Sequence, residues 1–153
     1  MATINANLSV SSDISDYGLS ISKTMTMKKA GTTDGLEKTT GLHRRSFLST
    51  NQVDLLTAGS GRAADVTASK AAKLYIKNIG TSATEYFTIG FGNSSGSTTH
   101  TATNGDATAF ELGRLYGGEW MIIPWLAVST TGDITIAPSV ATEMNVEYMA
   151  FHE

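Results

Sequence analysis

Apolar and polar residues alternate along two segments near the N-terminus. In the first segment every second residue is apolar: Ile4, Ala6, Leu8 and Val10. The second segment places in phase Leu19, Ile21, Met25 and Met27, and Lys23 interrupts its apolar side. Because successive side chains of a strand point to opposite faces, both segments are predicted to be strands with one buried face.

The same period of two returns from residue 73 onward. Leu74 and Ile76 share one parity, and after the polar, glycine-containing stretch 78–82 the alternation resumes at Phe87, Ile89 and Phe91. This pattern predicts two paired strands joined by a loop. Further strands are predicted around 110–112, 120–125, 134–136 and 144–150. The run 120–125 is so apolar that we expect it to be buried on both faces or covered by a neighbour.

The segments between these strands are polar. Residues 28–45 are predicted to form a long loop or an arm that orders on a partner, and 90–106 an exposed excursion rich in Gly, Ser, Thr and Asn. One or two short strands are predicted over 46–56 and a turn over 57–62. For 63–72, a brief helical turn and a strand fit about equally well.

These elements amount to roughly eight to ten short strands separated by turn signals, with no sustained helical periodicity. We therefore predict an all-β fold, an antiparallel β-sandwich or jelly-roll-like body with an extended N-terminal arm. The chain is expected to form a single domain over 1–153. Residues 1–50 supply the N-terminal strands and polar arm, and 51–153 the sandwich body.

Composition supports this prediction. The chain has 22 Thr, 16 Ser and 15 Gly but only 2 Pro, and its charged share of 16% is below the usual quarter or so. Threonine favours strands and serine favours turns. A surface rich in hydroxyls and poor in charge packs readily against copies of itself, so composition also suits a crowded assembly.

Charge and cysteine content narrow the function. The net charge of −3 gives no reason to expect nucleic-acid binding. The absence of cysteine excludes disulfides, thiol catalysis and Cys-ligated metal sites. The first residues lack the basic and apolar regions of a secretory signal, and no window approaches 18 apolar residues. We expect no membrane partner and assembly in a cytoplasm.

No residue pattern indicates catalysis. The histidines His43, His100 and His152 are too far apart in sequence to form a local acid–base or metal motif. No serine lies in a G-x-S-x-G elbow, and Gly90-Phe91-Gly92 lacks the third glycine and the helix start of a nucleotide fingerprint. Neither an enzyme nor a cofactor is expected.

Two charged groups have alternative interpretations. Asp13 and Asp16 flank a turn, which favours a solvated turn over a weak Ca²⁺ site. The basic run His43-Arg44-Arg45 is too small for a nucleic-acid footprint in an acidic chain. We expect it to make a salt-bridged contact to a neighbouring subunit, with a plain solvated face as the alternative.

The segment 115–125 is the most distinctive part of the sequence. Both tryptophans, Trp120 and Trp125, are five residues apart and therefore on opposite faces of a strand. One is predicted to enter the core and the other to face outward, where an interface is favoured over glycan stacking and over plain surface. Tyr116 joins them as a candidate interface residue.

The second half of the chain resembles small structural proteins of tailed bacteriophages. The resemblance rests on Leu74–Asn78, Ile89-Gly90, the turn Arg114–Glu119, Ile123-Pro124 and the closing segment Val146–Phe151. It covers about residues 70–153. It implies a compact β-sandwich, no enzymatic activity and a place in the virion as a head decoration, cement, head-fibre or tail-associated protein.

In that setting Gly117 and Gly118 permit a tight turn, Glu119 satisfies backbone amides there, and Pro124 lies at a strand end or edge. The expected partners are the major capsid protein or other virion proteins and copies of the chain itself. A capsid decoration or cement protein is the first hypothesis. A tail or neck component is the second, and a carbohydrate-binding module that uses Trp125 or Tyr116 for stacking is the third.

Overall fold

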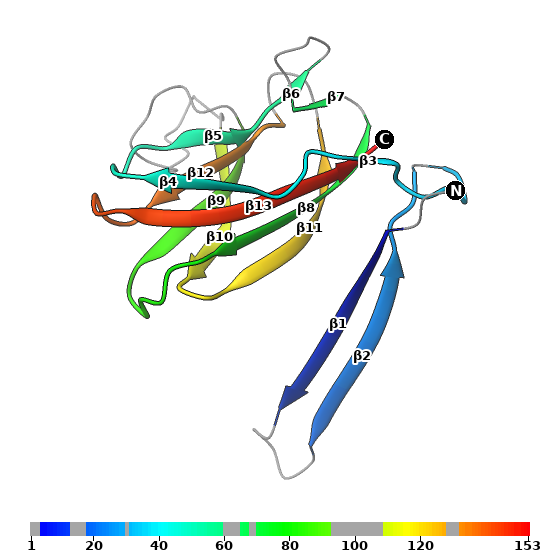
Figure 1. The fold of residues 1–153 in the computed structure, drawn as a ribbon, viewed down its shortest axis with the longest axis horizontal. Coiled ribbons are helices and arrows are strands. Elements are labelled where there is room, and N and C mark those ends of the chain that lie inside the picture. Colours follow the sequence, from blue (N-terminus) through cyan, green and yellow to red (C-terminus); the bar gives the residue numbers. More distant parts are fainter. Residues whose placement is uncertain are drawn as a thin grey trace. The chain divides into compact units, whose positions relative to one another are not determined.

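The computed structural model describes residues 4–12, 18–29, 31–59, 65–67, 70–92, 109–127 and 132–153, which form strands and no helix (Figure 1). This confirms the all-β prediction. The strands in chain order are β1 (Asn5–Ser12), β2 (Leu19–Thr26), β3 (Lys38–Thr39), β4 (His43–Phe47), β5 (Val53–Leu56), β6 (Ala58–Gly59), β7 (Val66–Thr67), β8 (Ala71–Asn78), β9 (Tyr86–Gly92), β10 (Ala109–Tyr116), β11 (Trp120–Leu126), β12 (Ile134–Pro138) and β13 (Met144–His152). The chain divides into two compact units, Met1–Glu37 and Lys38–Glu153.

The second unit, the body, is built from two antiparallel sheets (Figure 1). One has the strand order β10-β9-β12-β5, and the other has the order β11-β8-β13, with β13 also pairing with both β3 and β4. β12 and β13, the last two strands in sequence, therefore lie inside their sheets with partners on both sides. A short parallel pair, β6 and β7, lies outside these sheets.

The apolar parity of each sheet supplies the core. The rings of Phe47 on β4 and Phe87 on β9 meet edge to face, with centroids 5.5 Å apart, and so join the two sheets. The core members with 0% exposure are Leu74, Ile76, Phe87, Ile89, Ala127, Ile134, Ile136, Val146 and Ala150. This arrangement confirms a β-sandwich-like body.

The expected pairing of the strands around 74 and 89 is wrong. β8 pairs with β11 and β13, whereas β9 pairs with β10 and β12, so the loop between them carries the chain from one sheet to the other. The connection from β10 to β11 crosses between the sheets as well. Alternation determines which side chains share a face, but contacts distant in sequence determine which strands pair.

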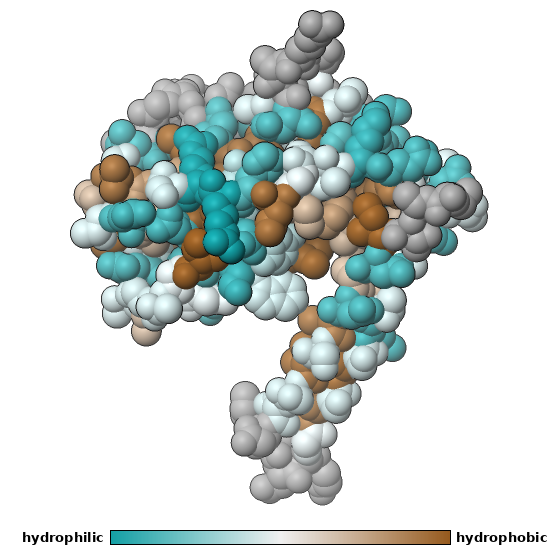
Figure 2. All heavy atoms as spheres, in the orientation of Figure 1, coloured by the Kyte–Doolittle hydropathy of each residue, from teal (hydrophilic) through white to brown (hydrophobic). Residues whose placement is uncertain are grey.

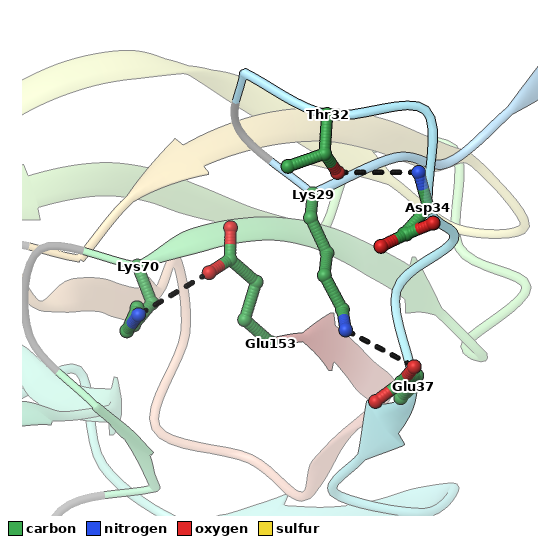
Figure 3. Close-up of polar contacts among 6 residues, drawn as sticks. All are labelled: Lys29, Thr32, Asp34, Glu37, Lys70 and Glu153. Atoms are coloured by element: carbon green, nitrogen blue, oxygen red, sulfur yellow. Dashed lines mark hydrogen bonds and ion pairs between the residues drawn. The ribbon is translucent and has the colours of Figure 1, made fainter.

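The polar stretch 28–45 is only partly a loop. Its C-terminal portion forms β3 and the start of β4, both on the edge of the sheet beside β13. Residues 66–67 and 71–72 are strand, which decides between the two alternatives for 63–72 within the described positions. At the end of the body, Lys70 pairs with Glu153 at 3.4 Å (Figure 3).

The first unit is dominated by an antiparallel hairpin of β1 and β2, in register from Asn5↔Thr26 to Ser12↔Leu19. The strands were correctly predicted, but the burial was not. Figure 2 shows hydrophobic side chains along this hairpin. Five large ones are exposed: Leu8 at 46%, Val10 at 39%, Leu19 at 51%, Ile21 at 38% and Met25 at 43%.

After β2 the first unit turns on itself. Lys28 forms an isolated bridge with Gly35, Asp34 N donates to Thr32 Oγ1 at 3.2 Å, and Lys29 pairs with Glu37 at 3.0 Å (Figure 3). Gly31, at φ +70°, supplies the left-handed backbone of this turn. Met27 and Leu36 are buried, and the Leu36 N–H donates to the Met27 carbonyl.

Candidate functional site

The turn between β10 and β11 contains Gly117, Gly118 and Glu119, as predicted from the sequence. Gly118 has φ +84°, and the Tyr116 N–H donates to Glu119 Oε2 at 2.8 Å, so Glu119 satisfies a backbone amide as expected. A Cβ on Gly117 would lie 2.5 Å from the Ser82 carbonyl oxygen. Glycine is therefore required at 117 by close backbone approach and favoured at 118 by conformation.

Asn78 anchors this turn to the rest of the body, a role that no motif in the sequence signalled. Its side chain is 1% exposed. Its Nδ2 donates to the Leu115 carbonyl at 3.0 Å, and its Oδ1 accepts from the Gly80 N–H at 2.9 Å. Because β8 and β10 belong to different sheets, this amide ties the two sheets together at one end.

A pocket of about 130 Å³ opens beside Asn78. It is lined in part by Glu85, Glu143 and Asn145. Among the residues that the structure describes, no three His, Asp or Glu side chains form a group that could hold a metal ion. The residues that line this pocket come from loops and strand ends far apart in sequence, which is why sequence reasoning did not find it.

The two tryptophans lie on opposite faces of β11, as predicted. Trp125 is 2% exposed, and its Nε1–H donates to the Gly132 carbonyl, whereas Trp120 is 50% exposed. Trp125 is therefore a core residue, and its use as an interface anchor or a glycan platform is wrong. Of the two alternatives for 120–125, burial on both faces is wrong within the chain, and cover by a neighbour stays a prediction.

The outward face of β11 carries an unbroken apolar row. Trp120, Pro124 and Leu126 are exposed and Ile122 is half-buried. β11 ends the order of its sheet, so Pro124 lies on an edge strand as predicted. We call Trp120, Ile122, Pro124 and Leu126 the β11 row.

Tyr116 lies at the end of the neighbouring edge strand β10. Its ring centroid is 5.2 Å from that of Tyr86, and the Arg114 guanidinium lies 4.5 Å from the Tyr86 centroid. Phe110 and Leu112 on the same strand are exposed. Tyr116 is thus half-buried in a small cluster with Tyr86 and Arg114.

The basic run on β4 is divided between two faces, because consecutive strand residues point in opposite directions. Arg44 makes its ion pair within the chain, to Glu147 of β13 at 2.9 Å. Arg45 donates to the Asp54 carbonyl and lies over the Phe47 ring, while His43 stacks on Tyr148. The three residues do not form one basic patch, and the salt bridge expected with a neighbouring subunit is, for Arg44, internal.

Glu147 is the centre of a polar cluster on the sheet. Its hydrogen bond from Arg44 holds the pKa of its carboxyl below the ordinary value of 4.5, and the Tyr75 hydroxyl donates to its other oxygen at 3.2 Å. Burial, followed by this hydrogen bond, raises the pKa of Tyr75. The cluster ties β4, β8 and β13 together.

The remaining candidates give little chemistry. His152 Nδ1 lies 3.0 Å from the Glu153 carbonyl, and Gly92 ends β9 with φ +131°, which makes Gly90-Phe91-Gly92 the end of a strand. Asp13, Asp16 and His100 lie outside the described residues. No described helix is long and apolar enough to cross a membrane.

Comparison with known proteins does not assign a family. No family model and no curated protein matches the chain. Among solved structures, the Yersinia pseudotuberculosis-derived mitogen matches with 11% identity and a TM-score of 0.39, and PliG, a periplasmic inhibitor of g-type lysozyme from Aeromonas hydrophila, with 11% and 0.31. Each match covers 74% of this chain and 85% of the other. At such TM-scores neither contributes to a functional argument.

Proposed function

We propose that this chain is a non-enzymatic structural protein that acts through contacts between subunits. In the setting that the sequence resemblance suggests, it is a capsid decoration or cement protein on the head of a tailed phage. The observation that carries the proposal is the β11 row, an apolar strip on the outward face of the strand that ends its sheet among the described residues.

Such a strip is costly on a protein that works alone. An uncovered edge strand presents backbone groups that pair with other chains, and natural monomers protect such edges with charged side chains. Residues 120–126 contain no charged residue, and Pro124 is the one edge-blocking residue among them. A row that begins with an exposed tryptophan therefore suits a surface that a partner covers, since tryptophan is a leading anchor of protein interfaces.

The mechanism would be burial repeated at every copy. Fully covering a large apolar side chain stabilises by about 1.5–3 kcal/mol, before the entropy cost of association. Repeated over a shell, contacts of this size would resist outward pressure and thermal opening. No proton transfer, cofactor or nucleotide enters this mechanism.

The direct test is co-sedimentation of the purified chain with separated heads and tails of the virus whose genome encodes it. We expect binding to heads, which Leu126→Asp abolishes and Thr50→Asp, at an exposed loop position, leaves unchanged. Binding to tails alone would favour the tail or neck alternative. Binding to neither particle would refute the virion role.

The carbohydrate-binding alternative now depends on Trp120 and Tyr116, because Trp125 is buried. Aromatic side chains on β-surfaces bind sugars by stacking. A fluorescence titration of the Trp125→Phe variant with oligosaccharides isolates Trp120. A saturable change with any sugar would support the binding module over the structural role.

A further inference from the structure

The β1–β2 hairpin has two faces of different character. On one face Thr24 Oγ1 donates to Asn7 Oδ1 at 2.8 Å and Thr26 Oγ1 to Asn5 Oδ1 at 2.9 Å, so its polar side chains satisfy one another at a water-facing surface. The other face, which we call the apolar stripe, consists of Ala6, Leu8, Val10, Ser12, Leu19, Ile21, Lys23 and Met25.

The apolar stripe needs a cover. A two-stranded hairpin is marginal in water unless its apolar face packs on something. Every large apolar side chain of the stripe is at least 38% exposed. The stripe is also unevenly built: the β1 side ends in the small residues Ala6 and Ser12, and the β2 side ends in Met25 and Leu19, directly across from them.

We propose that the cover is the apolar stripe of a second copy of this chain, packed face to face with the two hairpins parallel. A two-fold axis along the strands places β1 of one copy over β2 of the other. Met25 then lies over the partner's Ala6, Leu19 over the partner's Ser12, and Ile21 over the partner's Val10. Large residues meet small ones at both ends, which gives an evenly filled layer.

The antiparallel alternative fits poorly. A two-fold axis across the strands would place β1 over β1 and β2 over β2, so that Ala6 meets Ser12 at a gap while Leu19 meets Met25. In addition, Lys23 would lie over the partner's Ile21, which brings both ammonium groups to the same edge. In the parallel pair the two Lys23 ammonium groups lie at opposite edges of the interface, and each lysine's aliphatic stem crosses the partner's Leu8.

The size of the stripe indicates how strong the contact is. Eight residues at about 3.4 Å each, on two strands, give a face of about 27 by 10 Å, or about 270 Å² per copy. This is far below the roughly 800 Å² per partner of a stable interface. The hairpin contact is therefore weak in solution and gains strength where copies are held close together. That last step rests on the proposed function, since a shell is what would hold the copies.

Sedimentation of the full chain from micromolar to millimolar concentration tests the pairing. We expect a reversible monomer–dimer equilibrium. Ile21→Asp should weaken it about 100-fold, because it buries an unpaired charge. Ser20→Asp adds the same charge one residue away on the polar face and should leave the equilibrium unchanged. A wild-type chain that stays monomeric, or forms trimers, would overturn the proposal.

A mixing experiment separates lost pairing from lost folding. Val10→Lys should abolish self-association as Ile21→Asp does, but the two variants mixed should associate, because positions 10 and 21 meet across the parallel pair. If the Ile21→Asp variant still self-associates, the pair is antiparallel, because the new carboxylate would then face the partner's Lys23. That result would refute the parallel pair. No association in the mixture would refute it as well. Leu126→Asp on the body should keep the dimer, so a failure of the virion role and a failure of hairpin pairing give different results.

Discussion

Replacing Asn78 with leucine should be among the most damaging single changes in the body. Leucine has the same branching and the same number of non-hydrogen atoms, so the change replaces the amide oxygen and nitrogen with methyl groups and removes both hydrogen bonds. The buried Leu115 carbonyl then loses the Asn78 amide as a donor, and the half-buried Gly80 N–H loses the Asn78 oxygen as its acceptor.

The size of the effect follows from the two sites. A buried polar group that loses its partner costs about 1–3 kcal/mol. The Leu115 carbonyl lies opposite Phe87 in the ladder between β9 and β10, so losing the Asn78 amide as a donor should cost about 1–1.5 kcal/mol there. The Gly80 amide, which water reaches, should cost about 1 kcal/mol. We therefore expect the free energy of unfolding to fall by about 2 kcal/mol, a substantial fraction of the stability of a domain of this size.

Urea denaturation followed by tryptophan fluorescence is the appropriate assay, because Trp125 lies in the core that the two sheets share. The midpoint should fall while the slope stays the same, as for a loss of stability without a change in the denatured state. Asn51→Leu, at an exposed loop position, is the matched control. A loss below about 1 kcal/mol for Asn78→Leu would refute the argument that this amide joins the sheets.

Three further outcomes are expected. Gly117→Ala should lower the melting temperature much more than Gly118→Ala: its Cβ would lie 2.5 Å from a backbone oxygen, whereas alanine at 118 has open space and only an unfavourable φ of +84°. Equal effects would contradict this. Burial raises the pKa of the Asp133 carboxyl above its ordinary value of 3.8, so its pKa is higher in the folded than in the unfolded chain. As pH rises from the unfolded to the folded pKa of this group, the wild type should therefore lose stability. Asp133→Asn keeps an oxygen for the Ala58 N–H and should lack this loss, and parallel pH curves from urea titrations would rule the effect out. Trp125→Phe should leave a red-shifted emission that acrylamide quenches, and Trp120→Phe a blue-shifted one that resists it; the reverse would reject the assigned faces.

The sequence predicted what depends on local pattern. Trp120 and Trp125 are an odd number of residues apart, and strand geometry alone puts them on opposite faces. Glu119, Gly118 and Pro124 were assigned correctly because turn and edge chemistry is local. The all-β class followed from the same short-range alternation.

What the sequence could not supply depends on distant contacts. The alternation near residues 74 and 89 is real, but it could not show that the strands belong to different sheets. The hairpin alternation marks an apolar face without saying what covers it, which is how a half-buried strand was expected where Ile21 is exposed. In the sequence nothing distinguishes Asn78 from any other asparagine at a strand end, because its role depends on the Leu115 carbonyl, which only the fold brings close.

The position of the last two strands bears on how the protein is made. β12 and β13 each lie between earlier strands of different sheets, so each sheet lacks an interior strand until its own late strand has been synthesised. On a ribosome, β8 would emerge without its partner β13, and β9 without its partner β12. Closing the sheets then joins residues that are far apart in the chain, which slows folding. The body is therefore expected to fold only after residues 144–152 leave the exit tunnel, in one late step. Until then its unpaired strand edges favour aggregation.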